Sequence, residues 1–302
     1  MLLRINATDF DLVATLQCGQ AFRWRRGADG WFSGVVGNRV WRVRQSNGQL
    51  EIAGSPSDES VEIEKRSSLH FARFYFALDV PLRDVVATFP SDPVLQEAVA
   101  KHWGLRVLRQ EPWETLASFI ASSSKQIVQI QQIVELLARR FGEPIGGDQY
   151  AFPSAETIAR ASLSELRSCK LGFRAAYLRA AARRVARGQL DLAALRRMEY
   201  EQAKEALLKL EGVGEKIANC VLLFSCGHNE AFPVDVWMKR AVKRMQWRGT
   251  FGPYAGWAQQ YLFHAERLRT VAALRPQNPP RADPTPRARR VGQSARTGLQ
   301  VR

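Results

Sequence analysis

Lys216 and Asp235 are the two residues of this sequence whose types and positions best suit catalysis. Lys216 lies in the first turn of a helix predicted over residues 215–226, where the helix dipole disfavours a cation and favours the neutral, nucleophilic form of an amine. Asp235 begins a helix predicted over residues 235–246, and its carboxylate can remain ionised beside a cationic reaction centre. A solvated surface lysine and an ordinary helix N-cap are the alternative interpretations.

The tripeptide Gly212-Val213-Gly214 precedes the helix that carries the lysine and predicts a tight hairpin over residues 208–216. Two glycines one residue apart allow the backbone to turn sharply and to approach another molecule closely. The unpaired N–H groups at the start of the next helix attract an anion. Such a hairpin can hold a DNA phosphate through backbone amides without reading the base sequence. An ordinary turn between helices is the alternative, which the tripeptide alone does not exclude.

The charge of the chain favours a polyanionic partner. Its formal net charge is +15 over 302 residues, and nucleic acid is the commonest partner of such a protein. A basic surface that only keeps the protein soluble is the alternative. Residues 271–302 carry seven arginines against one aspartate, so we expect a disordered basic tail there, and the remainder of the chain is basic as well.

The composition also excludes several classes of protein. The chain contains four cysteines without any CxxC spacing, Cys18, Cys169, Cys220 and Cys226, so neither a zinc nor an iron–sulfur site is expected. The proposed chemistry needs no organic cofactor. No apolar run reaches the roughly eighteen residues of a membrane span. Without a recognisable signal peptide, we expect reduced thiols and a protein of the cytoplasm, at the nucleoid, in a bacterium or of the nucleus in a eukaryote.

The order of the predicted elements indicates an α+β fold. Alternating apolar and polar residues predict antiparallel strands at residues 31–36, 39–44 and 49–54. Apolar residues spaced three and four apart then predict helices, which fall at residues 64–78, 111–141 (one long helix or two consecutive ones), 173–187, 199–209, 215–226, 235–246 and 252–268. We therefore expect a β-rich N-terminal domain at residues 1–85, packed on a helical domain at residues 86–270, with the active site in a cleft between helical subdomains.

The sequence resembles the helix-hairpin-helix glycosylase superfamily, and within it the 8-oxoguanine DNA glycosylase/AP lyase branch. The hairpin with its lysine and the PVD motif at residues 233–235 carry the resemblance to the superfamily. The branch is indicated by CGQAFRW (18–24), LRQEPWETLASFI (108–120), LGFRAAY (171–177) and GPYAGWAQQYLF (252–263). The similarity covers roughly residues 9–268. It implies a TBP-like N-terminal domain, a monomer, and a partner that is double-stranded DNA containing oxidised guanine.

The resemblance also implies an activity and a role for each site residue. The chain would be a bifunctional base excision repair enzyme that removes 8-oxoguanine, and formamidopyrimidine-guanine as well. Lys216 would attack the sugar C1′ of a flipped nucleotide to form a Schiff base, and Asp235 would assist base loss and strand cleavage. The base-binding residues would be Gly19, Cys220, Pro233, Gln259 and Phe263. Without the resemblance, a turn glycine, a small buried cysteine and a core phenylalanine remain equally good interpretations of three of them.

The implied DNA contacts include departures from the animal form of the family. They are Gly212, Val213, Gly214, Ser124, Lys125, Gln126, Gln129, Phe173, Arg174 and Trp237. Ser124-Lys125-Gln126 replaces an asparagine run, Gln129 replaces an arginine that grips the orphaned cytosine, and Trp237 replaces a histidine. Arg174 matches a second cytosine-contacting arginine. Because glutamine is uncharged and shorter than arginine, we expect weaker discrimination by the opposite base.

Two other functions compete with this one. A glycosylase for another damaged base is the first, but iron–sulfur relatives carry four cysteines after the catalytic aspartate, and here none follows Cys226. Alkylbase glycosylases generally lack the hairpin lysine. A non-catalytic DNA-binding protein that kept the hairpin is the second, and the presence of both Lys216 and Asp235 disfavours it. Borohydride trapping distinguishes a non-catalytic DNA-binding protein from a glycosylase with lyase activity, because a protein that only binds DNA forms no covalent adduct.

Overall fold

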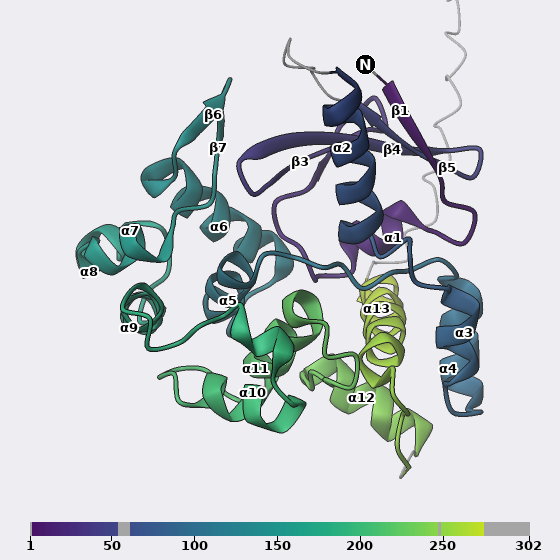
Figure 1. The fold of residues 1–302 in the computed structure, drawn as a ribbon. Helices are drawn as coiled ribbons and strands as arrows, with labels where there is room; N and C mark the ends of the chain where they lie inside the picture. The colour runs from purple at the N-terminus through teal and green to yellow at the C-terminus, as the bar shows by residue number, and fades with distance from the viewer. Residues whose placement is uncertain (1, 54–60, 247–248, 275–302) are drawn as a thin grey trace, which may run out of the picture.

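The computed structural model describes residues 2–53, 61–246 and 249–274 (Figure 1). The predicted disordered tail therefore lies, beyond its first four residues, outside the described residues. The described chain combines an antiparallel sheet near the N-terminus with a body of helices, so the predicted α+β fold class is confirmed. No helix among the described residues is both long and apolar enough to cross a membrane.

The sheet has five antiparallel strands in the order β1-β5-β4-β3-β2. Their bounds are β1 Leu2–Asn6, β2 Arg25–Arg26, β3 Phe32–Val36, β4 Arg39–Ser46 and β5 Gln49–Ala53. Alternation along β4 puts Trp41 and Val43 in the core while Arg42 lies exposed on the other face. Helices α1 (Leu12–Gln17) and α2 (Val61–Tyr75) contribute to the same core. The sheet module thus contains a helix, α1, that the strand pattern did not predict.

Helices and one short hairpin make up the rest of the described chain. Their bounds are α3 Leu82–Ala87, α4 Pro93–Lys101, α5 Pro112–Ala121, α6 Ile127–Phe141, β6 Pro144–Gly146, β7 Gln149–Tyr150, α7 Ala155–Arg160, α8 Leu163–Ser168, α9 Arg174–Ala186, the 3₁₀ turn η1 Ala194–Arg197, α10 Tyr200–Leu208, α11 Glu215–Val221, the π-helix η2 Leu222–Cys226, α12 Val236–Met245 and α13 Ala255–Leu274. A large apolar cluster centred on α5, α6, α9 and α11 forms the core of this body.

Two of the predicted helical segments are divided in the structure, and for the first of them two consecutive helices were one of the expected arrangements. The pattern over residues 111–141 belongs to two helices, because α5 ends at Ala121 and the chain turns at Ser124, whose φ is +56°. Residues 215–226 remain helical throughout, but the backbone hydrogen bonds change from the α type to the π type after Val221. Both interruptions lie next to predicted site residues.

A third apolar cluster joins the two ends of the described chain. It contains Cys18 and Leu105 together with α12 and α13. The Tyr261 hydroxyl donates to the carbonyl of Leu105 at 3.1 Å, and the Gln260 amide donates to the carbonyl of Cys18 at 3.1 Å. The first bond holds α13 against the segment after α4, and the second holds it against the segment after α1, which carries Gly19.

Candidate active site

The glycine hairpin joins α10 to α11, and the first of its glycines has a local structural reason. Gly212 has a φ of +79°, and a Cβ at this position would lie 2.4 Å from Cδ2 of Tyr177. Gly214 is exposed at the N-terminus of α11, and a Cβ built there would meet no heavy atom within 4 Å. Val213 is buried between them. The first turn of α11 is therefore accessible through this hairpin, as binding of a phosphate through its N–H groups requires.

Lys216 lies half-buried in the first turn of α11, with its amine directed at the end of α5. Its Nζ donates a hydrogen bond to Oγ of Ser122 at 3.3 Å. The same nitrogen lies 5.4 Å from the centroid of the Phe119 ring, within the range of a cation–π contact. The lysine side chain is thus held in one place in the DNA-free protein.

Asp235 caps α12, as its position in the sequence predicts. Its Oδ1 accepts hydrogen bonds from the backbone N–H groups of Trp237 and Met238, both at 2.9 Å. Pro233, two residues earlier, is buried and leads the chain into the helix. The cap orients the carboxylate, and the second oxygen stays available for another contact because an ionised carboxylate accepts several hydrogen bonds.

Cys220 brings the lysine and the aspartate into one site. It lies one turn after Lys216 on α11 and is only 3% exposed. Burial raises the pKa of its thiol to about 12, while the charge of Lys216 lowers this pKa and the charge of Asp235 raises it further. Lys216 and Asp235 thus both influence the buried sulfur atom electrostatically.

The predicted base-binding residues of the N- and C-terminal segments also meet. Gly19 has a φ of +81°, and a Cβ there would lie 3.5 Å from Cε1 of Phe263 and 3.0 Å from Cδ1 of Ile127. Gln259 lies one turn before Phe263 on α13 and is 3% exposed. Its Oε1 has no hydrogen-bond partner in the described part of the chain. Because α12 packs along α13, this group lies on the helix next to the one that Asp235 caps.

Arg174 lies against the loop between α5 and α6. Its guanidinium donates to the backbone carbonyls of Ser123 and Leu171, and it stacks at 4.4 Å on the ring of Phe173. Arg174 is 6% exposed, and burial lowers the pKa of its guanidinium. The neighbouring Phe173, in contrast to the buried Arg174, has 64% of its surface exposed. In the DNA-free protein the arginine therefore contacts the protein, and the phenylalanine projects from it.

The other predicted opposite-base residues lie at the N-terminus of α6. Ser124 and Gln126 are exposed, and Lys125 is half-buried. Gln129 is exposed as well, but its Oε1 accepts a hydrogen bond from the backbone N–H of Gln126 at 3.0 Å. This bond caps α6, because it satisfies an N–H group that has no partner within the helix. The amide oxygen of Gln129 thus has a structural partner that the sequence did not indicate.

Apolar side chains are unusually exposed on the same elements. Phe173 with 64%, Val236 with 62% and Val128 with 61% are the most exposed large apolar residues of the described chain. They occur at the start of α9, α12 and α6, beside Arg174, Asp235 and Gln129 respectively. Trp237, next to Val236, is half-buried and lies under Arg240, with 5.0 Å between guanidinium and ring. Exposed apolar side chains of this kind are typical of an interaction surface.

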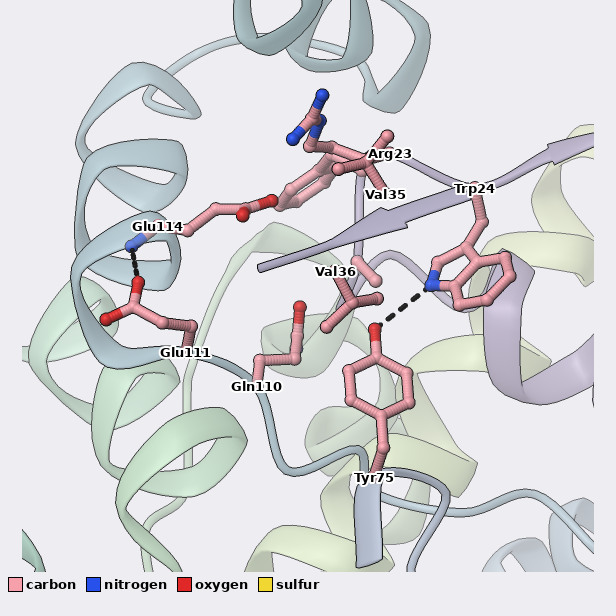
Figure 2. A pocket seen from close by; sticks show the side chains of 10 residues that line it. Arg23, Trp24, Val35, Val36, Tyr75, Gln110, Glu111 and Glu114 are labelled. Carbon is pink, nitrogen blue, oxygen red and sulfur yellow. Dashed lines mark hydrogen bonds between the residues drawn. The ribbon is translucent and has the colours of Figure 1, made fainter. Parts of the chain in front are cut away.

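A small pocket lies elsewhere, where the sheet meets α2 and the start of α5 (Figure 2). Its volume is about 20 Å³, which is room for a water molecule. Arg23 and Glu114 line it, and in Figure 2 the Trp24 indole N–H donates to the Tyr75 hydroxyl at 3.0 Å. Burial raises the pKa of Glu114 to about 7. The pocket includes no predicted catalytic residue, so it is distinct from the candidate active site.

Families and proteins of DNA repair match this chain along nearly its whole length. Residues 2–116 match the family described as the N-terminal domain of 8-oxoguanine DNA glycosylase, and residues 117–255 match the HhH-GPD superfamily of base excision DNA repair proteins. N-glycosylase/DNA lyase OGG1 of Arabidopsis thaliana is 31% identical, over 87% of this chain and 79% of its own. A probable N-glycosylase/DNA lyase of Methanothermobacter thermautotrophicus is 30% identical, over 90% and 99%. The chain belongs to the 8-oxoguanine DNA glycosylase family.

Solved structures of this family have the same fold. MBOgg1 in complex with a low-affinity DNA ligand is 34% identical, with a TM-score of 0.81 over 89% of this chain and 96% of that one. The 8-oxoguanine glycosylase/lyase of Clostridium acetobutylicum is 29% identical, with a TM-score of 0.78 over 89% and 98%. That protein is bound to double-stranded DNA with cytosine opposite 8-oxoG. The resemblance that the sequence motifs indicated is thereby confirmed.

Three residues of this glycosylase site were not identified from the sequence. Ser122 contacts the lysine from a different helix, Ile127 lies against Gly19, and Val128 is exposed beside Gln129. The apolar spacing of α6 would have revealed Val128, because it lies outside the buried face of Ile130, Ile133 and Val134. No sequence signal distinguishes Ser122 from its neighbours Ser123 and Ser124.

Proposed function

We propose that this protein is a bifunctional DNA glycosylase and AP lyase that removes 8-oxoguanine from double-stranded DNA. One observation supports this proposal most strongly. In a chain that matches N-glycosylase/DNA lyases over most of its length, a glycine hairpin is followed by a half-buried lysine whose amine contacts the end of α5, and an aspartate caps α12. Formamidopyrimidine-guanine, whose imidazole ring is opened but which also has an N–H at N7, is proposed as a second substrate.

Lys216 is proposed as the nucleophile. The lone pair of its Nζ forms a bond to C1′ of the flipped nucleotide, and the bond from C1′ to the base breaks with its electron pair going to the base. The positive charge that develops on the sugar is stabilised by the carboxylate of Asp235. Opening of the sugar gives the Schiff base, from which loss of a C2′ proton and of the 3′ phosphate cleaves the strand.

The base is proposed to bind between Cys220 and Phe263. The carbonyl of Gly19 would accept the N7–H that oxidised guanine has and guanine lacks. Gln259 would read the Watson–Crick edge, and its unpartnered Oε1 supports this role because a buried acceptor without a bond is costly in the free protein. Selection of the lesion then depends on one additional hydrogen bond together with stacking on both faces.

The remaining features of the proposal concern the whole chain. Residues 1–85 form the β-rich domain and residues 86–270 form the catalytic domain. The protein acts as a monomer on chromosomal DNA, at the nucleoid if it is bacterial and in the nucleus if it is eukaryotic. The glycine hairpin and the loop before α6 hold the backbone of the two strands on either side of the flipped nucleotide.

Borohydride trapping tests this function directly. The full chain should form a covalent adduct with a duplex that contains 8-oxoguanine opposite cytosine, and should form much less with the undamaged duplex. Lys216→Gln should form no adduct while keeping near-normal affinity for the lesion, because it removes the amine but little of the binding surface. Lys101→Gln, at an exposed lysine at the end of α4, is the matched control and should trap normally. Adduct formation by Lys216→Gln at the wild-type level would exclude Lys216 as the nucleophile.

A further inference from the structure

Ser122 is the C-cap residue of α5 and makes two hydrogen bonds of defined direction. Its hydroxyl donates to the carbonyl of Phe119 at 2.7 Å, and its Oγ lies 3.3 Å from Nζ of Lys216. A hydroxyl has one proton, and the bond to Phe119 uses it. Towards the lysine, Ser122 is therefore an acceptor only.

The ring of Phe119 supplies a second contact for the same amine. The Lys216 nitrogen lies 5.4 Å from the ring centroid, and an N–H group pointing at an aromatic face is weakly attracted to it. The ring itself is fixed, because Phe224 stacks on it at 5.6 Å and Phe22 packs edge-on at 5.4 Å. One residue thus orients Ser122 through its carbonyl and approaches Lys216 with its side chain.

These contacts define the direction of the lone pair of the neutral amine. A neutral lysine amine has two N–H groups and one lone pair. The positions of Oγ of Ser122 and of the Phe119 ring give each N–H an acceptor, and with both N–H groups so directed the lone pair points away from both groups. A hydroxyl that donated its proton to Nζ would instead occupy the lone pair and block attack. The bond from Ser122 to the Phe119 carbonyl prevents this arrangement.

We propose that Ser122 is a positioning residue that orients the lone pair of the Lys216 amine for attack on C1′. Ser122 is 5% exposed, so water has little access to replace it as the acceptor. It neither gains nor loses a proton in the step, since the new C–N bond uses the nitrogen lone pair and the base departs with the electrons of the broken bond. The inference rests on the proposed function and extends it to a residue on a different helix from the nucleophile.

The test separates amine reactivity from DNA binding. The full-length chain is mixed with a duplex containing a preformed abasic site, and the rate of borohydride-trapped adduct is measured, so that base removal plays no part. Affinity for a duplex with 8-oxoguanine is measured in parallel without borohydride. Ser122→Ala should lower the trapping rate about 10-fold, because a misaligned reactant loses a large part of its proximity advantage, while the affinity changes less than about 2-fold.

Three further variants make the result specific to the hydroxyl. Ser122→Cys keeps the size of the side chain but offers a poor acceptor, so it should trap slowly and decides the question if the alanine variant fails to fold. Ser122→Thr keeps the hydroxyl and should trap faster than both. Ser225→Ala is the matched control, because Ser225 is a buried serine that donates to the carbonyl of Val221 in its own helix; it should trap at the wild-type rate.

Each outcome has a definite meaning. Wild-type trapping rates for folded Ser122→Ala or Ser122→Cys would overturn the positioning role, and so would an equal slowing by Ser225→Ala. A folded threonine variant that traps no faster than alanine would also contradict it. If the wild-type chain itself formed no adduct with the abasic duplex, the proposed lyase function would fail, and this inference would fail with it. If the wild-type chain formed the adduct and the Ser122 variants trapped equally fast, only the inference would fail.

Discussion

Gln259 shows how one side chain can serve binding at the expense of stability. It is 3% exposed, and its Oε1 has no hydrogen-bond partner among the described residues. A buried acceptor left without a bond costs about 1–3 kcal/mol. The free protein tolerates this cost, and we propose that the Watson–Crick edge of the bound lesion supplies the missing donor.

Replacement of Gln259 by leucine should therefore affect stability and activity in opposite directions. Gln259→Leu keeps a similar volume and removes the unpartnered oxygen, so the free energy of unfolding should stay constant or rise by roughly 1 kcal/mol. Single-turnover excision of 8-oxoguanine should fall. Denaturant unfolding and excision assays on the same preparation check both parts. A variant that is clearly less stable than wild type would mean that the oxygen has a partner in the free protein.

At the level of residues, the sequence could single out the proposed catalytic pair but not the residues around it. Lys216 and Asp235 each have a local signature, a glycine hairpin and a helix start, that is visible in a single sequence. Their common neighbour Cys220 follows from helical spacing. Ser122 lies 94 residues before Lys216, so only the packing of α5 on α11 brings them together, and no local pattern contains that information.

The N-terminus of α6 combines capping with the proposed reading of the opposite base. The Gln129 amide oxygen accepts the Gln126 N–H at 3.0 Å, and this bond keeps the side chain folded back on its own helix. An arginine has no acceptor and could not make this bond. Glutamine at this position therefore contributes to the local structure of α6 as well as to the chemistry proposed for the orphaned base.

Gln129→Arg should lower the stability of the protein and raise its selectivity for the base opposite the lesion. Loss of the cap should lower the free energy of unfolding by about 0.5–1 kcal/mol, and the forked guanidinium should increase the preference for cytosine opposite the lesion. Excision of 8-oxoguanine placed opposite C, A, G and T, under identical single-turnover conditions, measures the preference. Gln132→Arg adds the same charge to an exposed position of the helix and should change neither quantity much. An unchanged preference in Gln129→Arg would assign the reading to other residues.

Among the elements, strands and helices with strong periodicity were predictable, whereas their interruptions depended on tertiary structure. The predicted strands lie within one or two residues of β3, β4 and β5. The break between α5 and α6 was left open by the pattern, because serines at residues 122–124 neither start nor stop a helix decisively. The helix α1 was not predicted, since six residues are too few for a periodic signal.

The junction between the sheet and the helical body contains the carboxyl group of Glu114. Burial raises its pKa to about 7 from an ordinary value of 4.5. The unfolded chain loses this proton at a lower pH than the folded chain does. Stability attributable to Glu114 is therefore full below about pH 4.5 and declines as the pH rises towards 7.

Glu114→Gln should remove this decline, because glutamine does not ionise. The variant should be more stable than the wild type at pH 8, and the difference should vanish near pH 4. Thermal or denaturant unfolding at the two pH values is the measurement. Glu143→Gln, at an exposed carboxylate, should show no comparable pH-dependent gain. A Glu114→Gln difference that is the same at both pH values would place the group in an ordinary, solvated environment.

The charge of the whole molecule governs its affinity for DNA in general. Residues 275–302 contain seven arginines and one aspartate. Because α13 extends to Leu274, removal of residues 275–302 leaves the described helices intact. Each lost phosphate contact should reduce the slope of log affinity against log salt by about 0.9, while single-turnover excision at saturating enzyme should stay unchanged. A loss of excision under those conditions would assign the tail a role in folding or catalysis.

The bonds between α13 and the N-terminal segment have a consequence for synthesis of the protein. Gln260 bonds to Cys18 across 242 residues, and Arg267 bonds to the carbonyl of Gln17 across 250. A nascent chain that emerges from the ribosome has its hairpin lysine before it has the helix that closes the base pocket. Gly19 and the Lys216 amine are thus made before Gln259 and Phe263, which complete the proposed base pocket. A prematurely terminated chain that lacks α13 has the amine but only part of that pocket, and so is expected to excise neither intact bases nor lesions.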